Sequence, residues 1–162
     1  MAILGATGVY ARHLTPRLTA RGYVVRALVR RPEAAGVAKG CGADIRVADI
    51  FDVSSLETAL AGCTLGVNLA TSLPGPSGRG DFDANDRLRR DGTPVWIEAC
   101  KRARVGRILQ QSIAMVNAGT GDDWSDEDTV FSGGSDDTAL RAIDASLAME
   151  QAIRSSELEF TI

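Results

Sequence analysis

The sequence predicts an α/β protein: a Rossmann-type doubly wound parallel sheet with helices on both faces. Two observations carry this prediction. Short apolar segments alternate with longer amphipathic segments throughout the 162 residues, and a glycine-rich turn closes the first apolar segment. Parallel strands need crossover connections, which are right-handed and usually helical. No repeat, low-complexity tract or linker interrupts the alternation, so residues 1–162 are expected to form one domain.

The first three predicted strands are short and aliphatic. Residues 1–4 precede the glycine turn, residues 23–29 are rich in valine, and residues 44–47 form a third apolar segment. Such runs are typical of buried strands. Leucines at helical spacing between the first two strands predict a helix that ends at Arg21-Gly22.

Two helices and a strand complete the first half. Pro32 suits a first helical turn, and the helix it opens is expected to run to about Lys39. A third helix follows Ser54, whose hydroxyl we expect to form a capping box with Glu57. Residues 65–70 then predict a fourth strand.

The second half continues the same alternation. A long helix near the end is marked by apolar residues at helical spacing, at Leu140, Ile143, Leu147 and Ile153. The other predicted elements are a loop at 71–80, a helix at 93–104, a strand at 107–112, a polar stretch at 117–137 and a strand at 159–162.

The glycine turn predicts a dinucleotide site. Gly5 allows a tight turn, Gly8 allows a ligand to approach closely, and Ala11 supplies the small residue that helix-to-strand packing needs. Amides at a helix N-terminus bind phosphate groups, so the pyrophosphate is expected there. A purely structural turn is the alternative. The residues expected to bind the cofactor here are Gly5, Ala6, Thr7, Gly8, Val9, Tyr10 and Ala11.

Five short motifs in order make the chain resemble the short-chain dehydrogenase/reductase superfamily, in its extended and atypical branches. These branches include the NAD-dependent epimerase/dehydratases and the NmrA-like proteins. The motifs span nearly the whole chain; they are Gly-Ala-Thr-Gly at 5–8, Ala-Asp-Ile at 48–50, Asn-Leu-Ala-Thr at 68–71, Asp-Gly-Thr at 91–93 and Gln-Ser at 111–112.

The resemblance implies roles for six residues outside the glycine turn. Asp49 and Ile50 would flank the adenine, and Ser112 would stand near the substrate as a catalytic hydroxyl. Asp49 alternatively only begins the loop before the third helix, and Ser112 alternatively is an ordinary serine at a strand end. The residues that would line the nicotinamide ribose are Leu69, Ala70 and Thr71.

The end of the second strand favours NADP over NAD. An acidic residue there would bind the ribose 2′-hydroxyl, whereas a cationic residue accommodates a 2′-phosphate. The chain has Arg30 and Arg31 at this point, and the first carboxylate is Glu33. A solvated pair of arginines is the alternative, and it leaves the nucleotide undecided.

The resemblance fails at the catalytic pair. Reductases of the superfamily use a tyrosine as general acid or base, with a lysine four residues later. Counting back from Glu150, these positions hold Ala142 and Ser146, and the only tyrosines are Tyr10 and Tyr23. Three functions therefore remain open: an atypical NADP-dependent oxidoreductase or isomerase of a small carbonyl or sugar-nucleotide substrate, a non-catalytic NmrA-like redox sensor acting through a regulatory protein partner, and a domain without nucleotide.

Composition and charge limit the kinds of partner that the sequence predicts, and they indicate a cellular compartment. A formal net charge of -3 offers no basic surface for nucleic acid, and no window is long and apolar enough for a membrane span. Three widely spaced cysteines support neither a disulfide framework nor a zinc site, and the acidic run at 122–128 lacks calcium-loop spacing, so no metal is expected. We expect a cytoplasmic protein. The resemblance also implies a possible homodimer and a further C-terminal substrate-binding part.

Overall fold

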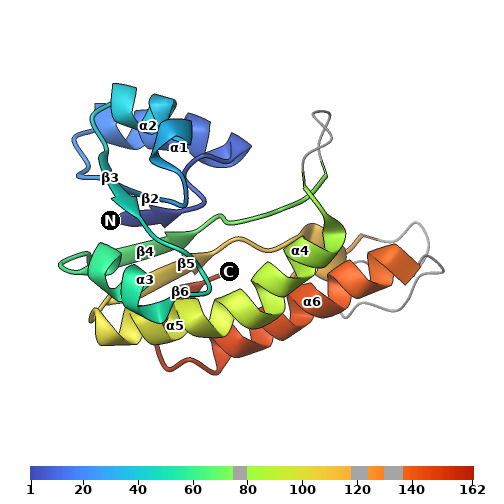
Figure 1. The fold of residues 1–162 in the computed structure, drawn as a ribbon. Helices are drawn as coiled ribbons and strands as arrows, with labels where there is room; N and C mark the ends of the chain where they lie inside the picture. Colours follow the sequence, from blue (N-terminus) through green and yellow to red (C-terminus); the bar gives the residue numbers. More distant parts are fainter. Residues whose placement is uncertain (75–79, 118–123, 130–136) are drawn as a thin grey trace.

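The computed structural model describes residues 1–74, 80–117, 124–129 and 137–162, and within them six parallel strands form one sheet (Figure 1). The strand order is β3-β2-β1-β4-β5-β6. It confirms the predicted doubly wound sheet, because the order reverses between β1 and β4. The strands are β1 (Ala2–Leu4), β2 (Arg26–Val29), β3 (Asp44–Val47), β4 (Leu65–Asn68), β5 (Arg107–Gln110) and β6 (Glu159–Thr161).

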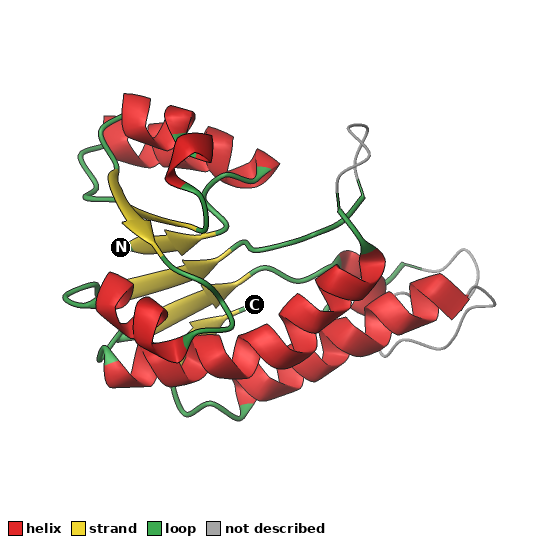
Figure 2. Ribbon diagram, in the orientation of Figure 1, coloured by secondary structure: helices red, strands yellow, loops and turns green. Residues whose placement is uncertain are grey.

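Helices cover both faces of this sheet (Figure 2). On one face lie α1 (Val9–Ala20) and α2 (Gly36–Gly40), which a short 3₁₀ turn at Pro32–Ala34 precedes. On the other face lie α3, α5 and α6. The elements of this second layer are α3 (Val53–Leu60), α4 (Phe82–Arg87), a π-helical turn (Leu88–Gly92), α5 (Thr93–Arg102), a 3₁₀ turn (Ala114–Asn117) and α6 (Asp137–Arg154).

Each face of the sheet carries its own apolar core. Ile3 packs with Ala11 of α1 and Ala38 of α2, whereas Leu4 packs with Trp96 of α5 on the opposite face. Successive side chains of a strand point to opposite faces, so neighbouring residues of β1 enter different cores. The second core also depends on Gly66, where an added Cβ would lie 2.8 Å from the Trp96 ring.

The third helix begins at a different cap from the one expected. The Asp52 carboxylate accepts hydrogen bonds from the amides of Ser54 and Ser55, at 3.0 and 3.3 Å. Asp52 is the N-cap of α3, so Ser54 lies inside the first turn and the predicted Ser54–Glu57 capping box is wrong. An aspartate two residues earlier satisfies the same free amides, because its carboxylate is also a good N-cap acceptor.

The helix predicted at 93–104 is part of a longer one. Helical structure begins at Phe82 and continues through the π-helical turn into α5. Gly92 and Pro94 look like the start of a helix in the sequence. The chain nevertheless continues as a helix through them, because α4 and the π-helical turn pack against α6.

One of the apolar residues that mark α6 in the sequence lies on its exposed side. Leu147 is 41% exposed, whereas Ile143, Met149 and Ile153 are buried. Ser146 is also fully buried on this face, with its hydroxyl donating to the carbonyl of Ala142 at 2.6 Å. Leu147 therefore does not share the buried face of Ile143 and Ile153, whereas polar Ser146, one position away, does.

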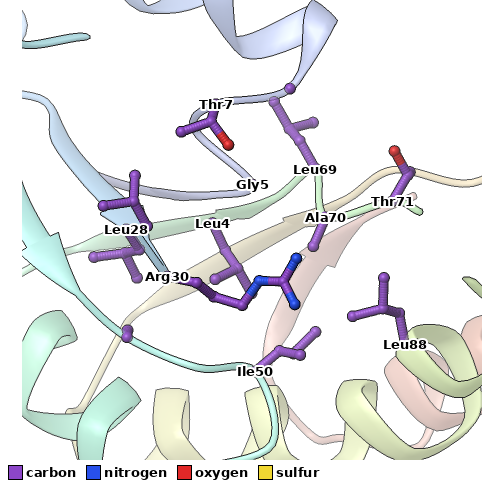
Figure 3. Close-up of a pocket in the computed structure, with 13 residues that line it drawn as sticks. Leu4, Gly5, Thr7, Leu28, Arg30, Ile50, Leu69, Ala70, Thr71 and Leu88 are labelled. Carbon is purple, nitrogen blue, oxygen red and sulfur yellow. The ribbon is translucent and has the colours of Figure 1, made fainter. Parts of the chain in front are cut away.

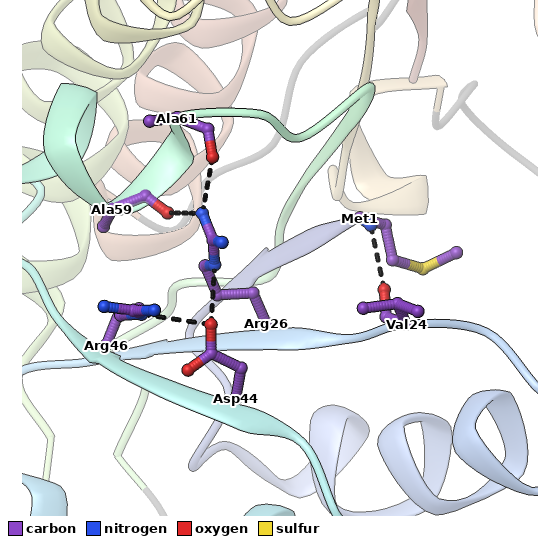
Figure 4. Close-up of polar contacts among 7 residues, drawn as sticks. All are labelled: Met1, Val24, Arg26, Asp44, Arg46, Ala59 and Ala61. Atoms are coloured by element: carbon purple, nitrogen blue, oxygen red, sulfur yellow. Dashed lines mark hydrogen bonds and ion pairs between the residues drawn. The ribbon is translucent and has the colours of Figure 1, made fainter.

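Arg26 links three elements at the edge of the sheet (Figure 4). Its Nη1 donates to the carbonyls of Ala59 and Ala61 at the end of α3, both at 2.8 Å, and its Nε donates to Asp44 of β3 at 3.0 Å. Burial acts to raise the pKa of Asp44, but hydrogen bonds from Arg46 and Arg26 outweigh it and hold that pKa below its ordinary value. Arg26 therefore satisfies carbonyls that the end of α3 leaves free.

Candidate functional site

A pocket opens where the first four strands end, around the point at which the strand order reverses (Figure 3). Ligands of doubly wound sheets bind in the crevice at this switch point. The lining residues are Leu4, Gly5, Thr7, Gly8, Leu28, Val29, Arg30, Ala48, Ile50, Leu69, Ala70, Thr71 and Leu88.

The glycine turn forms one side of this pocket. Gly5 has a φ of 78°, in the region that favours glycine, and an added Cβ would lie 2.7 Å from the backbone of Leu69 and Ala70. The amide of Gly8 donates to the carbonyl of Gly5 at 2.9 Å, and Gly8 is the N-cap of α1. Only glycine fits at position 5, because the conformation and the space both exclude a side chain.

The N-terminus of α1 suits an anion. No side chain caps this fully described helix, and its first turn contains no acidic residue. The first amides of a helix have no intrahelical acceptor, and the helix dipole favours negative charge near them. The turn and α1 therefore fit the pyrophosphate of a dinucleotide.

The predicted cofactor residues fall into two groups. Ala6 and Ala11 are buried in the core beneath the turn, while Val9 and Tyr10 project from the first turn of α1 and are 71% and 70% exposed. The side chains of Ala6 and Ala11 therefore do not face a ligand, and none of these four residues lines the pocket. The structure brings the other group together around the pocket: Gly5, Thr7, Gly8, Arg30, Ile50, Leu69, Ala70 and Thr71.

The two arginines after β2 differ in position. The guanidinium of Arg30 extends across the pocket toward Ile50 and Leu88 (Figure 3). Arg31 is exposed outside the pocket lining and precedes the 3₁₀ turn at Pro32–Ala34. Arg30 is therefore the cation nearest the site of a ligand, and Arg31 lies one residue further out.

Asp49 serves the loop that enters α3. Its carboxylate accepts a hydrogen bond from the amide of Phe51 at 3.0 Å, and its own amide donates to the Ser55 hydroxyl at 3.1 Å. Its neighbour Ile50 lines the pocket. The contacts of the Asp49 side chain thus agree with the structural alternative, whereas the Ile50 side chain is available to a ligand in the pocket.

Ser112 is directed toward α6. Its hydroxyl donates to Glu150 at 2.5 Å, and Glu150 also pairs with Arg154 at 3.5 Å. Ser112 does not line the pocket described above. The positions of the missing catalytic pair offer no replacement acid, because Ala142 has no polar group and the Ser146 hydroxyl is buried on the Ala142 carbonyl.

Buried side-chain amides hold the segment after β4, at the end of the pocket near Thr71. The motif at 68–71 indicated this segment but not the contacts that hold it in place. Asn68 accepts a hydrogen bond from the Ala70 amide and donates to Gln110, both at 3.0 Å. Asn85 of α4 accepts one from the amide of Ser72, also at 3.0 Å. These side chains set the path of the backbone on both sides of Thr71.

Three further features of the described residues concern a second hollow, metal binding and membrane crossing. A hollow on the exposed side of α1 is lined by that helix alone. Among the described residues, no group of three or more histidine, cysteine or acidic side chains could hold a metal ion; positions 122 and 123 of the acidic run lie outside that part of the chain. No helix in the described segments is both long and apolar enough to cross a membrane.

The fold and this pocket define a dinucleotide-binding α/β protein. The family model described as NAD(P)H-binding matches residues 5–162, and the chain belongs to this family. The match confirms the NAD(P)-binding class that the glycine turn and the other motifs indicate. The protein has the NAD(P)-binding fold shared by reductases and epimerases.

Similar proteins extend the comparison. A 3-diazoavenalumate denitrifying reductase from Streptomyces is 32% identical over 161 residues, which are 96% of this chain and 52% of that protein. The chain thus spans about half the length of this relative. A putative NAD-dependent epimerase/dehydratase from Bacillus halodurans has a similar fold, with a TM-score of 0.74 at 24% identity, over 100% of this chain and 68% of the other.

A structure with bound cofactor is also similar. The NADPH-dependent quinone oxidoreductase QOR2 from Escherichia coli, complexed with NADPH, has a TM-score of 0.66 at 21% identity. The match covers 98% of this chain and 46% of that one. At this level of identity the likeness establishes the fold alone.

Proposed function

We propose that the protein binds NADP(H) in the pocket of Figure 3 and belongs to a reductase that acts on a small carbonyl or related acceptor. One observation carries the proposal: the glycine cradle at Gly5 and the guanidinium of Arg30 face the same pocket at the switch point of the sheet. The reductase name of the relative from Streptomyces supports this class.

The proposed nucleotide spans the pocket from β2 to β4. Its pyrophosphate lies at the turn that begins with Gly5, and its 2′-phosphate lies at Arg30 with Arg31 beside it. The nicotinamide ribose lies along Leu69, Ala70 and Thr71. The preference for NADP over NAD follows from the charge at the end of β2, where two arginines precede the first carboxylate.

The residues of this chain bind and orient the nucleotide. When bound, the nicotinamide supplies or accepts a hydride, which is one proton together with two electrons. The reduced acceptor also needs a proton, which Ser112 passes on only if its hydroxyl leaves Glu150 and takes up a proton from water in return. Otherwise the proton comes from water, because Ala142 and Ser146 replace the usual pair.

The test begins with binding. Calorimetric titration with NADPH, NADP⁺, NADH and NAD⁺ should give the tightest binding for the two phosphorylated nucleotides. Arg30→Ser should weaken NADPH about 10- to 100-fold, since a charge-assisted hydrogen bond contributes about 1.5–3 kcal/mol. Its effect on NADH should be small. Arg21→Ser, at the exposed C-cap of α1, is the matched control and should change neither affinity.

A turnover assay then separates the reductase from the second candidate, a non-catalytic NmrA-like redox sensor. The hydrogen bond that takes up the Ser112 hydroxyl favours the sensor. NADPH oxidation with a panel of quinones, aldehydes, ketones and imines supports the reductase. Tight binding with no turnover, together with unequal affinities for NADP⁺ and NADPH, supports the sensor, because equal affinities cannot shift a conformational equilibrium. Failure to bind any nucleotide refutes both.

A further inference from the structure

One wall of the pocket comes from a helix whose residues no motif assigned to the nucleotide. Leu88 lines the pocket and is the first residue of the π-helical turn at Leu88–Gly92. Such turns are rare and occur frequently at functional sites. In Figure 3, Leu88 and Ile50 lie on the same side of the pocket, with the Arg30 guanidinium between them and the sheet.

The end of this turn lies directly beneath Ile50. A Cβ added at Gly92 would be 2.8 Å from Ile50 Cδ1, 3.0 Å from Cγ1 and 3.4 Å from Cγ2. These distances are shorter than the 3.5–4.0 Å of an ordinary carbon contact. The Ile50 side chain can therefore lie against the helix, away from the pocket, only because residue 92 has no side chain.

A second contact holds the same loop against the same helix. The guanidinium of Arg87 lies 4.4 Å from the centre of the Phe51 ring, and its Nε is 3.8 Å from Asp91. A cation above an aromatic face is attracted to it even at exposed sites. Contacts at consecutive residues, Ile50 and Phe51, thus set the distance between the loop and the helix.

The π-helical turn is held in place by a contact with α6. Arg89, within the π-helical turn, is buried and its Nη1 donates to the carbonyl of Ala142 on α6 at 3.1 Å. Burial lowers the pKa of Arg89, and nearby Asp86 opposes this effect. The turn therefore cannot easily retreat from the pocket, and an enlarged residue 92 would displace Ile50 rather than the helix.

We propose that Leu88 and Gly92 are positioning residues for the adenosine half of the bound nucleotide. Leu88 closes the pocket with its side chain, and Gly92 sets how far the Ile50 side chain is withdrawn from the space that the adenosine enters. The inference rests on the proposed nucleotide binding and adds the helical wall to the residues that the sequence motifs indicate.

The test is Gly92→Ala with a compensating substitution. The nearest atom to the new methyl is the free end of Ile50, so the protein should fold while Ile50 moves into the pocket. Because the displaced Ile50 side chain then occupies part of the pocket, NADPH should bind about 10-fold more weakly, which corresponds to about 1.4 kcal/mol. Ile50→Val removes the δ-methyl group, and the double variant should return to within about 3-fold of Ile50→Val alone.

Two controls separate this effect from a general one. Gly40→Ala, in α2 with no atom within 4 Å of the added Cβ, should leave binding unchanged. Gly92→Ala should weaken adenosine 2′,5′-bisphosphate as much as NADPH, because the wall faces only that half of the nucleotide. Leu88→Ala should weaken the same two ligands.

The outcomes distinguish the two proposals. If the unmodified protein binds NADPH, and Gly92→Ala binds it equally well or is not rescued by Ile50→Val, the positioning inference is wrong and the proposed function stands. A loss of NADPH binding without a matching loss for the bisphosphate also overturns the inference. If the unmodified protein binds none of the four nucleotides, the proposed function and the inference fail together.

Discussion

Replacement of Arg26 by methionine should destabilise the protein more than the matched replacement of Arg46, the other arginine that binds Asp44. Methionine keeps the length and the apolar character of the arginine stem but removes its donors. The change leaves the Ala59 and Ala61 carbonyls at the end of α3 without their donor, and it leaves Asp44 with Arg46 as its remaining partner.

The contacts of Arg26 give the size of the effect. A hydrogen bond from a charged donor contributes about 1.5–3 kcal/mol, but here one nitrogen serves both carbonyls. The Asp44 side chain is 41% exposed, so solvent screens its ion pair and little is added. The expected loss is therefore about 2–3 kcal/mol. In a domain of this size that lowers the melting temperature by about 4–12 °C.

Urea denaturation followed by circular dichroism measures this loss. Arg46→Met is the matched control, because Arg46 bonds the same Asp44 oxygen at 3.0 Å but is 54% exposed; it should cost less than about 1 kcal/mol. Equal losses for the two variants would refute the reasoning, since they would show that the carbonyls of α3 contribute nothing. A loss below about 1 kcal/mol for Arg26→Met would refute it as well.

Two other predictions test the turn and the ion pair. Gly5→Ala should abolish nucleotide binding in a calorimetric titration and cost at least about 2 kcal/mol in urea, because the new methyl meets the backbone after β4 in a left-handed conformation; unchanged binding would contradict the cradle. Because the pKa of Asp44 is lowered in the folded state, its ionised carboxylate stabilises the fold at pH values above the pKa of an ordinary aspartate. This contribution should be lost as the pH falls through the folded-state pKa. Asp44→Asn should flatten the acid limb of a stability-against-pH curve; an unchanged slope would show that another group causes it.

Much of the fold follows from local signals that the sequence displays. Alternating apolar and amphipathic segments predict the parallel sheet, and the strand at 44–47 is found at the predicted residues. The glycine turn is also visible in the sequence, since a φ of 78° and a backbone contact at Gly5 are needs that only glycine meets. These features depend on a few adjacent residues, which is why a single sequence contains them.

Interactions between distant elements decided much of what the sequence did not show. On α6, Leu147 faces outward while Ser146 is buried. The sequence identified Ser112 but not its partner Glu150, 38 positions away and on another element. In each case several local arrangements have similar energies, and packing against a distant element selects one of them.

The candidate site likewise depends partly on local sequence and partly on packing between distant segments. The sequence by itself determined the class of fold, the phosphate turn and the presence of two arginines after β2. Only the tertiary structure turned Arg30 toward the pocket, continued a helix through Gly92 and Pro94, and placed Gly92 beneath Ile50. The reason is physical: a turn is specified by the conformations its own residues allow, whereas a pocket wall exists only where segments separated by about 40 residues pack together.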